Sequence, residues 1–193
     1  MDKKDIAAFF DRCAPGWDAD MVRSDEIIGA IMLGGGIREG IHVLDVACGT
    51  GVVIPDYLKR NVASVTAVDI SPDMVKIARA KFPQENVTVL CGDIEEVQLA
   101  RKFDCIMVYN AFPHFPDPEK LIDTLSGLLA PGGTLTVAHG MSRAAIDRHH
   151  EGRASKVSIG LMHEDALVAI FKKHLTVTVK ISDDQMYQVT GKK

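Results

Sequence analysis

The stretch that decides the fold of this chain is Val43-Leu44-Asp45-Val46-Ala47-Cys48-Gly49-Thr50-Gly51. It begins as an apolar, β-branched run and ends in two glycines, and residues 52–60 that follow are compatible with a helix. Glycines at a turn between strand and helix let a ligand approach the backbone, and free N–H groups at the helix start favour an anionic or polar group. The stretch therefore predicts the first strand of a parallel α/β sheet, with a ligand at its carboxyl end.

Further strands are expected downstream of this stretch, because short apolar or β-branched runs recur between turn residues. They cover residues 64–69, 87–91, 103–109 and 134–139. Helices are expected between them: Ser71 and Pro72 supply an N-cap and a first-turn proline for a helix that ends near residue 83, and residues 118–129 are amphipathic. This alternation predicts a doubly wound, mostly parallel sheet with helices on both faces, in three αβα layers.

The two ends of the chain extend this sheet. A helix over residues 164–174 precedes two strands, 175–181 and 185–190, whose three-residue connection predicts an antiparallel C-terminal hairpin and brings the sheet to seven strands. Helices over 5–12 and 20–32 precede the first strand. We therefore expect an N-terminal helical lid or extension over residues 1–40 and a ligand-binding domain over 41–193, with an inserted helical segment at about 141–160.

Composition limits the classes of partner. The 193 residues are 47% hydrophobic and 25% charged, as in one soluble globular domain, and the net charge of −4 gives no general attraction for nucleic acid or an anionic membrane. Four scattered cysteines form no C-x-x-C pair, and the first residues do not resemble a signal peptide. These features favour a cytoplasmic monomer or homodimer with a small-molecule partner, and neither nucleic acid nor membrane as a partner.

Three aspartates fall at, or just beyond, the carboxyl ends of predicted strands: Asp45, Asp69 and Asp93. Open α/β sheets bind ligands at this edge, and a carboxylate that ends the second strand can accept both hydroxyls of a ribose. Each aspartate also has a structural alternative, since Asp45 could satisfy backbone N–H groups and the other two could serve as caps or turn residues. A nicotinamide dinucleotide site is disfavoured, because Ile54 stands where its third glycine would be.

With these motifs the chain resembles class I, seven-stranded S-adenosylmethionine-dependent methyltransferases of the small-molecule type. The resemblance runs from about residue 41 to the C-terminus and implies S-adenosylmethionine as cofactor and a small-molecule methyl acceptor. It implies contacts to the methionine part from Asp45, Ala47, Gly49, Gly51 and Asn110, to the ribose from Asp69, and to the adenine from Ile70, Asp93 and Ile94. Ala47 departs from the family, which often has glycine there.

Two alternatives to a methyltransferase stay open at this point. One is a non-catalytic, S-adenosylmethionine-binding regulatory protein, and the less favoured one is a nicotinamide-dinucleotide oxidoreductase.

The resemblance also extends to the lid: in this interpretation Phe10 and Trp17 close over the cofactor and exclude water. Both aromatic rings could instead simply anchor the first helix to the core.

The acceptor side of the predicted site contains two histidines. His114 follows the fourth strand and His139 the fifth, so they could face one another across a pocket, with His114 the first candidate for a general base and His139 the second. A polar substrate contact, a metal site and simple packing are alternatives. No metal is predicted, because no zinc spacing is present and Asn110 stands where the Mg²⁺-dependent catechol type needs a carboxylate. The segment 142–153 is expected to form a substrate-recognition helix that carries Arg143, Arg148, His149 and His150.

Overall fold

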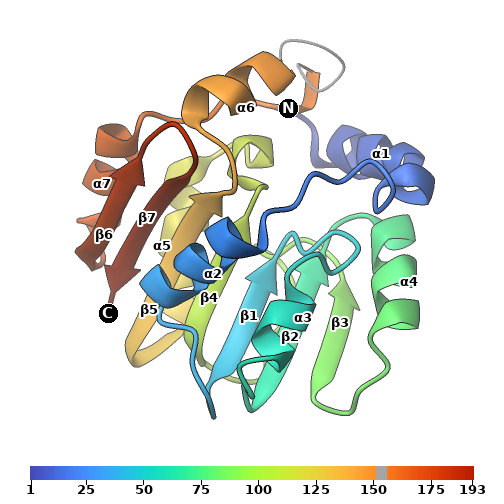
Figure 1. Cartoon of the computed structure of the whole chain (residues 1–193), viewed down its shortest axis with the longest axis horizontal. Coiled ribbons are helices and arrows are strands. Elements are labelled where there is room, and N and C mark those ends of the chain that lie inside the picture. Colours follow the sequence, from blue (N-terminus) through green and yellow to red (C-terminus); the bar gives the residue numbers. More distant parts are fainter. Residues whose placement is uncertain (151–155) are drawn as a thin grey trace.

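The computed structural model describes residues 1–150 and 156–193 and contains a seven-stranded sheet (Figure 1). The strand order is β3-β2-β1-β4-β5-β7-β6, in which β5, β7 and β6 pair antiparallel and the others parallel. The strands are β1 His42–Val46, β2 Ser64–Asp69, β3 Val87–Cys91, β4 Phe103–Tyr109, β5 Leu129–His139, β6 Thr176–Ser182 and β7 Tyr187–Lys192. This topology confirms the predicted fold class, including the C-terminal hairpin.

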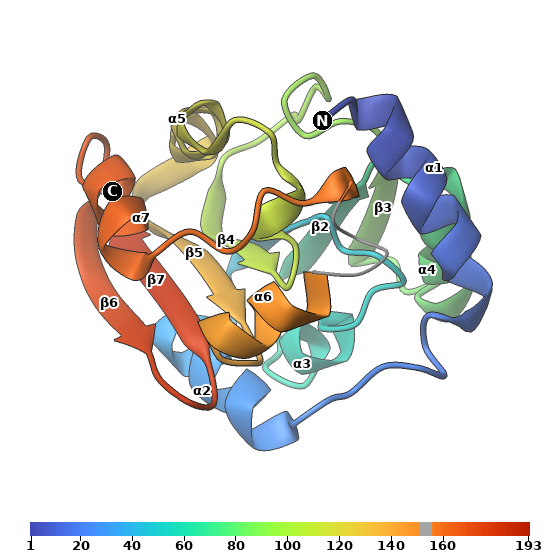
Figure 2. The same cartoon turned by 90° about the horizontal axis from the view of Figure 1, so that it is seen from above.

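Helices cover both faces of the sheet, which gives the three predicted layers (Figure 2). The structure has α1 Lys3–Cys13, α2 Asp25–Gly34, α3 Ile54–Leu58, α4 Pro72–Lys81, α5 Pro118–Leu128, α6 Arg143–His150 and α7 Glu164–Phe171. Helices α5 and α7 pack on one face, and α2, α3 and α4 pack on the other. Helix α1 lies beside α4, and α6 lies over the edge of the sheet where the parallel strands end (Figure 2).

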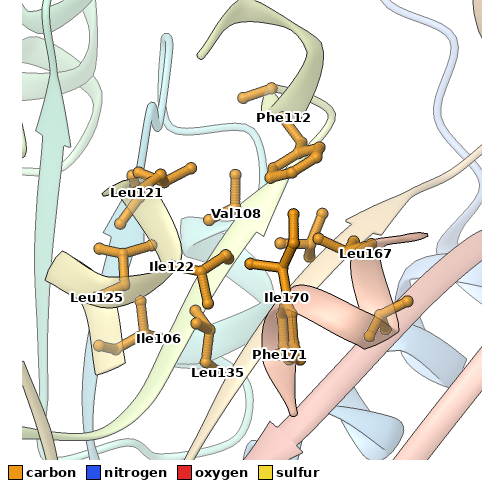
Figure 3. Close-up of a cluster of buried hydrophobic side chains, with 14 of the residues drawn as sticks. Ile106, Val108, Phe112, Leu121, Ile122, Leu125, Leu135, Leu167, Ile170 and Phe171 are labelled. Carbon is orange, nitrogen blue, oxygen red and sulfur yellow. The ribbon is translucent and has the colours of Figure 1, made fainter. Parts of the chain in front are cut away.

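The core sits on both sides of β1 and β4, whose apolar runs are buried on each face. On the α5 and α7 side, Phe112 packs at the end of β4 above Val108, in a cluster with Leu121, Ile122 and Phe171 (Figure 3). Each fully buried side chain of this size contributes roughly 1.5–3 kcal/mol to stability. This burial fixes the end of β4, and with it the turn that carries His114.

Three boundaries differ from the sequence-based expectations. Strand β5 begins at Leu129, not Thr134, and its pairing with β4 shifts register there, so residues 131–133, which precede the expected strand, form a bulge within it. Helix α2 begins only at Asp25, because the Ser24 side chain caps it by accepting from the Ile27 N–H. The hairpin connection has four residues, 183–186, since the Asp183 carboxylate accepts from two of their N–H groups.

Two further expectations concern membrane-spanning helices and the segment after β5. None of the helices in the described part of the chain combines the length and apolar character needed to cross a bilayer. The recognition helix predicted over 142–153 coincides with α6 at Arg143 and Arg148, whereas residues 151–153 and the side chains of His149 and His150 lie outside the described residues.

Candidate ligand-binding site

A cavity opens at the carboxyl ends of β1, β2 and β4, beneath residues of the N-terminal segment. It brings together most of the residues that the sequence pointed to, from four strand ends and the first helix region. The predicted residues that line it are Phe10, Trp17, Asp45, Ala47, Gly49, Asp69, Ile70, Asp93, Ile94, Asn110 and His114. Gly51 and His139 do not line it.

The glycine turn after β1 forms the floor of the cavity. Gly49 and Gly51 have φ of +55° and +84°, conformations that side chains disfavour. The turn is tied to β2, because the Gly49 N–H donates to Asp69 Oδ2 over 2.7 Å and the Ser71 N–H donates to Asp69 Oδ1 over 2.8 Å. A Cβ built at Gly49 would meet only the Trp17 indole nitrogen, at 3.8 Å. The turn thus leaves its backbone open to a ligand that slides beneath the indole.

Ala47 also has a positive φ, +55°, although it carries a side chain. The left-handed conformation costs an alanine roughly 1–2 kcal/mol, whereas glycine adopts it freely. Glycine in turn lowers the free energy of unfolding by about 0.4–1 kcal/mol, because the unfolded chain has more conformational entropy. We therefore expect Ala47→Gly to raise the free energy of unfolding by about 0.5–1 kcal/mol, measured by urea denaturation. The control is Ala63→Gly at an exposed position without positive φ, which should destabilise. Equal losses in both variants would contradict this account.

Asp45 is buried beside the turn, 1% exposed, and its Oδ2 has no hydrogen-bond partner among the residues that the structure describes. Burial, and next the nearby Asp69 carboxylate, raise its pKa to about 8. The neighbouring Tyr57 hydroxyl acts in the opposite direction and lowers the pKa of Asp45, although it completes no hydrogen bond among the described residues. A buried carboxylate oxygen without a donor, at the wall of a cavity, is suited to a cationic group such as an ammonium.

At the opposite end of the cavity, Asp93 pairs with the Lys3 ammonium of α1. Lys3 also donates to Glu95 over 2.8 Å, and Lys120 lies 2.7 Å from the same carboxylate, whose side chain is only 3% exposed. These ion pairs fasten α1 across the loop after β3. Sequence reasoning missed Lys3 and Glu95, because 92 residues separate the two partners and no motif links them.

The segment between α1 and α2 is fastened by polar contacts as well. Asp18 accepts from the Thr50 hydroxyl of the glycine turn. The Arg23 guanidinium donates to both oxygens of Asp56 over 2.8 Å, and also to the Val52 carbonyl over 2.8 Å. Both Trp17 and Arg23 line the cavity. The N-terminal segment is therefore bound to the first strand–turn–helix unit from the side that covers the cavity.

The two candidate histidines lie in different surroundings. His114 lines the cavity, its Nδ1 lies 2.6 Å from the Val157 carbonyl oxygen, and its ring meets Phe10 edge to face at 4.9 Å. His139 is 1% exposed and packs against Tyr187 of the paired strand, with ring centroids 6.2 Å apart. Its side chain falls on the same covered face of β5 as that of Val137, two residues earlier. The structure therefore does not bring the two histidines together across the cavity.

Asn110 ends β4 with a φ of +53° and accepts from the Gly140 N–H over 2.9 Å. It thus joins the ends of β4 and β5 at the cavity wall. Among the side chains that the structure describes, which leave out those of residues 149–155, no group of three or more His, Cys, Asp or Glu is arranged as a metal site needs. Besides carboxylates and backbone N–H groups, the cavity lining offers the Asn110 amide, the His114 imidazole and the cationic groups of Lys3 and Arg23.

Comparisons with known proteins agree with this geometry. Residues 44–137 match the family model described as a methyltransferase domain. A ubiquinone biosynthesis O-methyltransferase of Coxiella burnetii is 33% identical over 143 residues, which cover 70% of this chain and 61% of the relative. The chain thus spans less than two thirds of that relative's length.

Two solved structures share the fold. One is the Haloferax volcanii protein solved as a complex with the Trm112 methyltransferase activator, with a TM-score of 0.81, 19% identity and coverage of 95% of this chain and 96% of that one. The other is the N-methyltransferase NodS of Bradyrhizobium japonicum with bound S-adenosylhomocysteine, with a TM-score of 0.70, 17% identity and coverage of 87% and 86%.

Proposed function

We propose that this chain, whose residues 44–137 match the methyltransferase-domain family model, is a class I methyltransferase that transfers a methyl group from S-adenosylmethionine to a small-molecule acceptor. The observation that carries the proposal is the cavity at the sheet edge, where a buried carboxylate, an open glycine turn and a second carboxylate meet. The relatives' names alone do not fix the acceptor of this chain.

The residues present fit the cofactor. Asp45 would hold its ammonium, because the carboxylate oxygen without a partner requires a donor. The glycine turn would admit the methionine part, and Asp69 would bind the ribose hydroxyls with the lone pairs left over from its two backbone contacts. Ile70, Asp93 and Ile94 would surround the adenine.

When bound, S-adenosylmethionine supplies an electrophilic methyl group whose departure from sulfur needs no proton. The chain's own contribution is therefore mainly orientation and exclusion of water. Trp17 and Phe10 would cover the site from the N-terminal segment, Asn110 would contact the methionine end, and His114 would face the acceptor as general base. All four cysteines are free thiols, in keeping with the proposal of a cytoplasmic enzyme.

The test combines binding and turnover. Calorimetry should show that S-adenosylhomocysteine binds, and titrations at pH 7 in buffers of different ionisation enthalpy should show release of close to one proton, from Asp45 as the ammonium arrives. Incubation of S-adenosylmethionine with candidate acceptors should then yield S-adenosylhomocysteine. Binding without turnover of any acceptor would favour the non-catalytic regulatory alternative, and absence of binding would refute the proposal.

Asp45 also predicts how the ligand-free protein responds to pH. Because its folded-state pKa of about 8 lies above the ordinary 3.8, the folded state holds the proton more tightly. This contribution to stability is complete below about pH 4 and is lost as the pH rises through about 8. Asp45→Asn, which mimics the neutral acid, should match wild type at about pH 3, gain over it as the pH rises from about 4 to 8, and be more stable at about pH 9 in urea unfolding. Parallel pH profiles of the two proteins would contradict the assignment.

A further inference from the structure

His114 is held by a segment far away in the sequence. It ends a short 3-10 turn, Phe112–His114, and residues after α6 run beside this turn. The Ile159 N–H donates to the Pro113 carbonyl over 2.9 Å, and His114 Nδ1 lies 2.6 Å from the Val157 carbonyl oxygen. Val157 itself is 3% exposed, and Phe112 is fully buried. Buried neighbouring side chains therefore hold both the Val157 carbonyl and the turn that carries His114 in place.

The chemistry of this contact determines where the imidazole proton resides. A carbonyl oxygen can only accept a hydrogen bond, so His114 Nδ1 must donate and must carry a proton. In the neutral ring the other nitrogen, Nε2, then keeps the basic lone pair. The Val157 carbonyl thus selects one of the two tautomers, as a partner of the second ring nitrogen does in other histidine sites.

The N-terminal segment completes the support of the ring. Phe10 of α1 meets the His114 imidazole at an interplanar angle of 81° and meets Trp17 at a centroid distance of 5.8 Å. All three rings line the cavity. The His114 ring, which lines the cavity, is therefore oriented by Val157 on one side and by Phe10 of the N-terminal segment on the other.

We infer that the Val157 carbonyl and Phe10 hold His114 as the Nδ1–H tautomer, so that Nε2 takes the proton of an acceptor hydroxyl during methyl transfer. The inference rests on the proposed function. In this step the acceptor oxygen forms a bond to the methyl carbon while the carbon–sulfur bond breaks and leaves its electron pair on sulfur. The O–H proton passes to Nε2, and the resulting imidazolium later loses it to solvent.

A hydroxyl is the acceptor that such a base serves best. A neutral amine already has a lone pair for attack, and a thiol with a pKa of about 8.5 supplies thiolate unaided. Phenols, with a pKa of about 10, remain protonated at neutral pH and gain most from a positioned base. His114 and Val157 therefore point to O-methylation of a phenolic compound. Val157 and Phe10 are positioning residues in this scheme.

The tautomer is tested without turnover. Nitrogen-15 spectra of the imidazoles, with the His114 signals assigned by their absence in His114→Gln, should show the proton on Nδ1 of the neutral ring. A neutral ring protonated at Nε2 would overturn the inference. Phe10→Leu should give a mixture of both tautomers, whereas Lys4→Gln, at an exposed position of the same helix outside the cavity lining, should leave the spectrum unchanged. An unchanged spectrum in Phe10→Leu would remove Phe10 from the scheme.

The base role is tested with small phenols and catechols as probes, beside matched anilines and thiophenols. His114→Gln retains a donor for the Val157 carbonyl but cannot take a proton, so kcat with a phenol should fall by about 100-fold or more while the Kd of S-adenosylhomocysteine stays within about threefold. A loss of kcat below threefold would refute the base. If the protein binds S-adenosylhomocysteine but methylates no hydroxyl compound, the inference fails while the cofactor assignment stands; if nothing binds, the proposed function itself fails.

Discussion

Replacing Asp69 with asparagine is expected to weaken S-adenosylhomocysteine binding by about 100-fold, the loss of roughly 3 kcal/mol. The carboxylate accepts from the N–H groups of Gly49 and Ser71 and would accept from the ribose. An asparagine amide turns an NH₂ group toward one of these donors, so a donor then faces a donor. The variant should therefore lose one of the two backbone contacts as well as the carboxylate that would accept from the ribose hydroxyls.

Calorimetric titration of S-adenosylhomocysteine into Asp69→Asn measures this loss. The matched control is Asp73→Asn, a neighbouring exposed carboxylate outside the cavity lining, which should keep the wild-type Kd. Thermal melting without ligand checks that the variant is folded. If folded Asp69→Asn binds as tightly as wild type, Asp69 has only the structural role that its backbone contacts describe.

Much of this site could be predicted because parallel strands end at one edge of the sheet. Once β1 and β2 were recognised as apolar runs, Asp45 and Asp69 had to lie near each other, since each closes or nearly closes its strand. The same reasoning placed Asp93 and Asn110. None of these steps needs a side-chain conformation, only strand ends and connection order.

The remainder of the site depends on contacts that a sequence does not display. Lys3 meets Asp93 and Arg23 meets Asp56 because the N-terminal segment folds over the sheet edge, and no periodic pattern in the sequence links the two charges of either pair. His139 was expected at the cavity because it ends β5, but a strand alternates its side chains between faces, and its parity with Val137 turns it into the core. The end of a strand predicts where along the sheet edge a residue lies. The face of the sheet on which its side chain lies depends on its alternation with the neighbouring residues of the strand.

Gly51→Ala is expected to destabilise the protein by about 2–5 kcal/mol, which lowers Tm by roughly 5–15 °C. Gly51 has a φ of +84°, and a Cβ there would lie 2.5 Å from the Phe82 ring and 2.9 Å from Ile54. The backbone strain alone costs roughly 1–2 kcal/mol, and forced displacement of packed side chains adds about 1–3 kcal/mol. The loss should appear in both thermal and urea unfolding.

Gly40→Ala separates these two contributions. Gly40 has nearly the same φ, +78°, but a Cβ there would meet nothing within 4 Å, so only the backbone cost of roughly 1–2 kcal/mol remains. Equal destabilisation of the two variants would mean that packing against Phe82 is unimportant. A larger loss in Gly51→Ala would assign to Gly51 a role distinct from that of Gly49: the former lets α4 and its last turn close against the first unit of the sheet, and the latter leaves its backbone open to the ligand. The two glycines of one motif then serve different purposes: Gly51 permits close packing, and Gly49 permits ligand binding. Of the two, only a substitution at Gly49 should directly weaken the binding of S-adenosylhomocysteine.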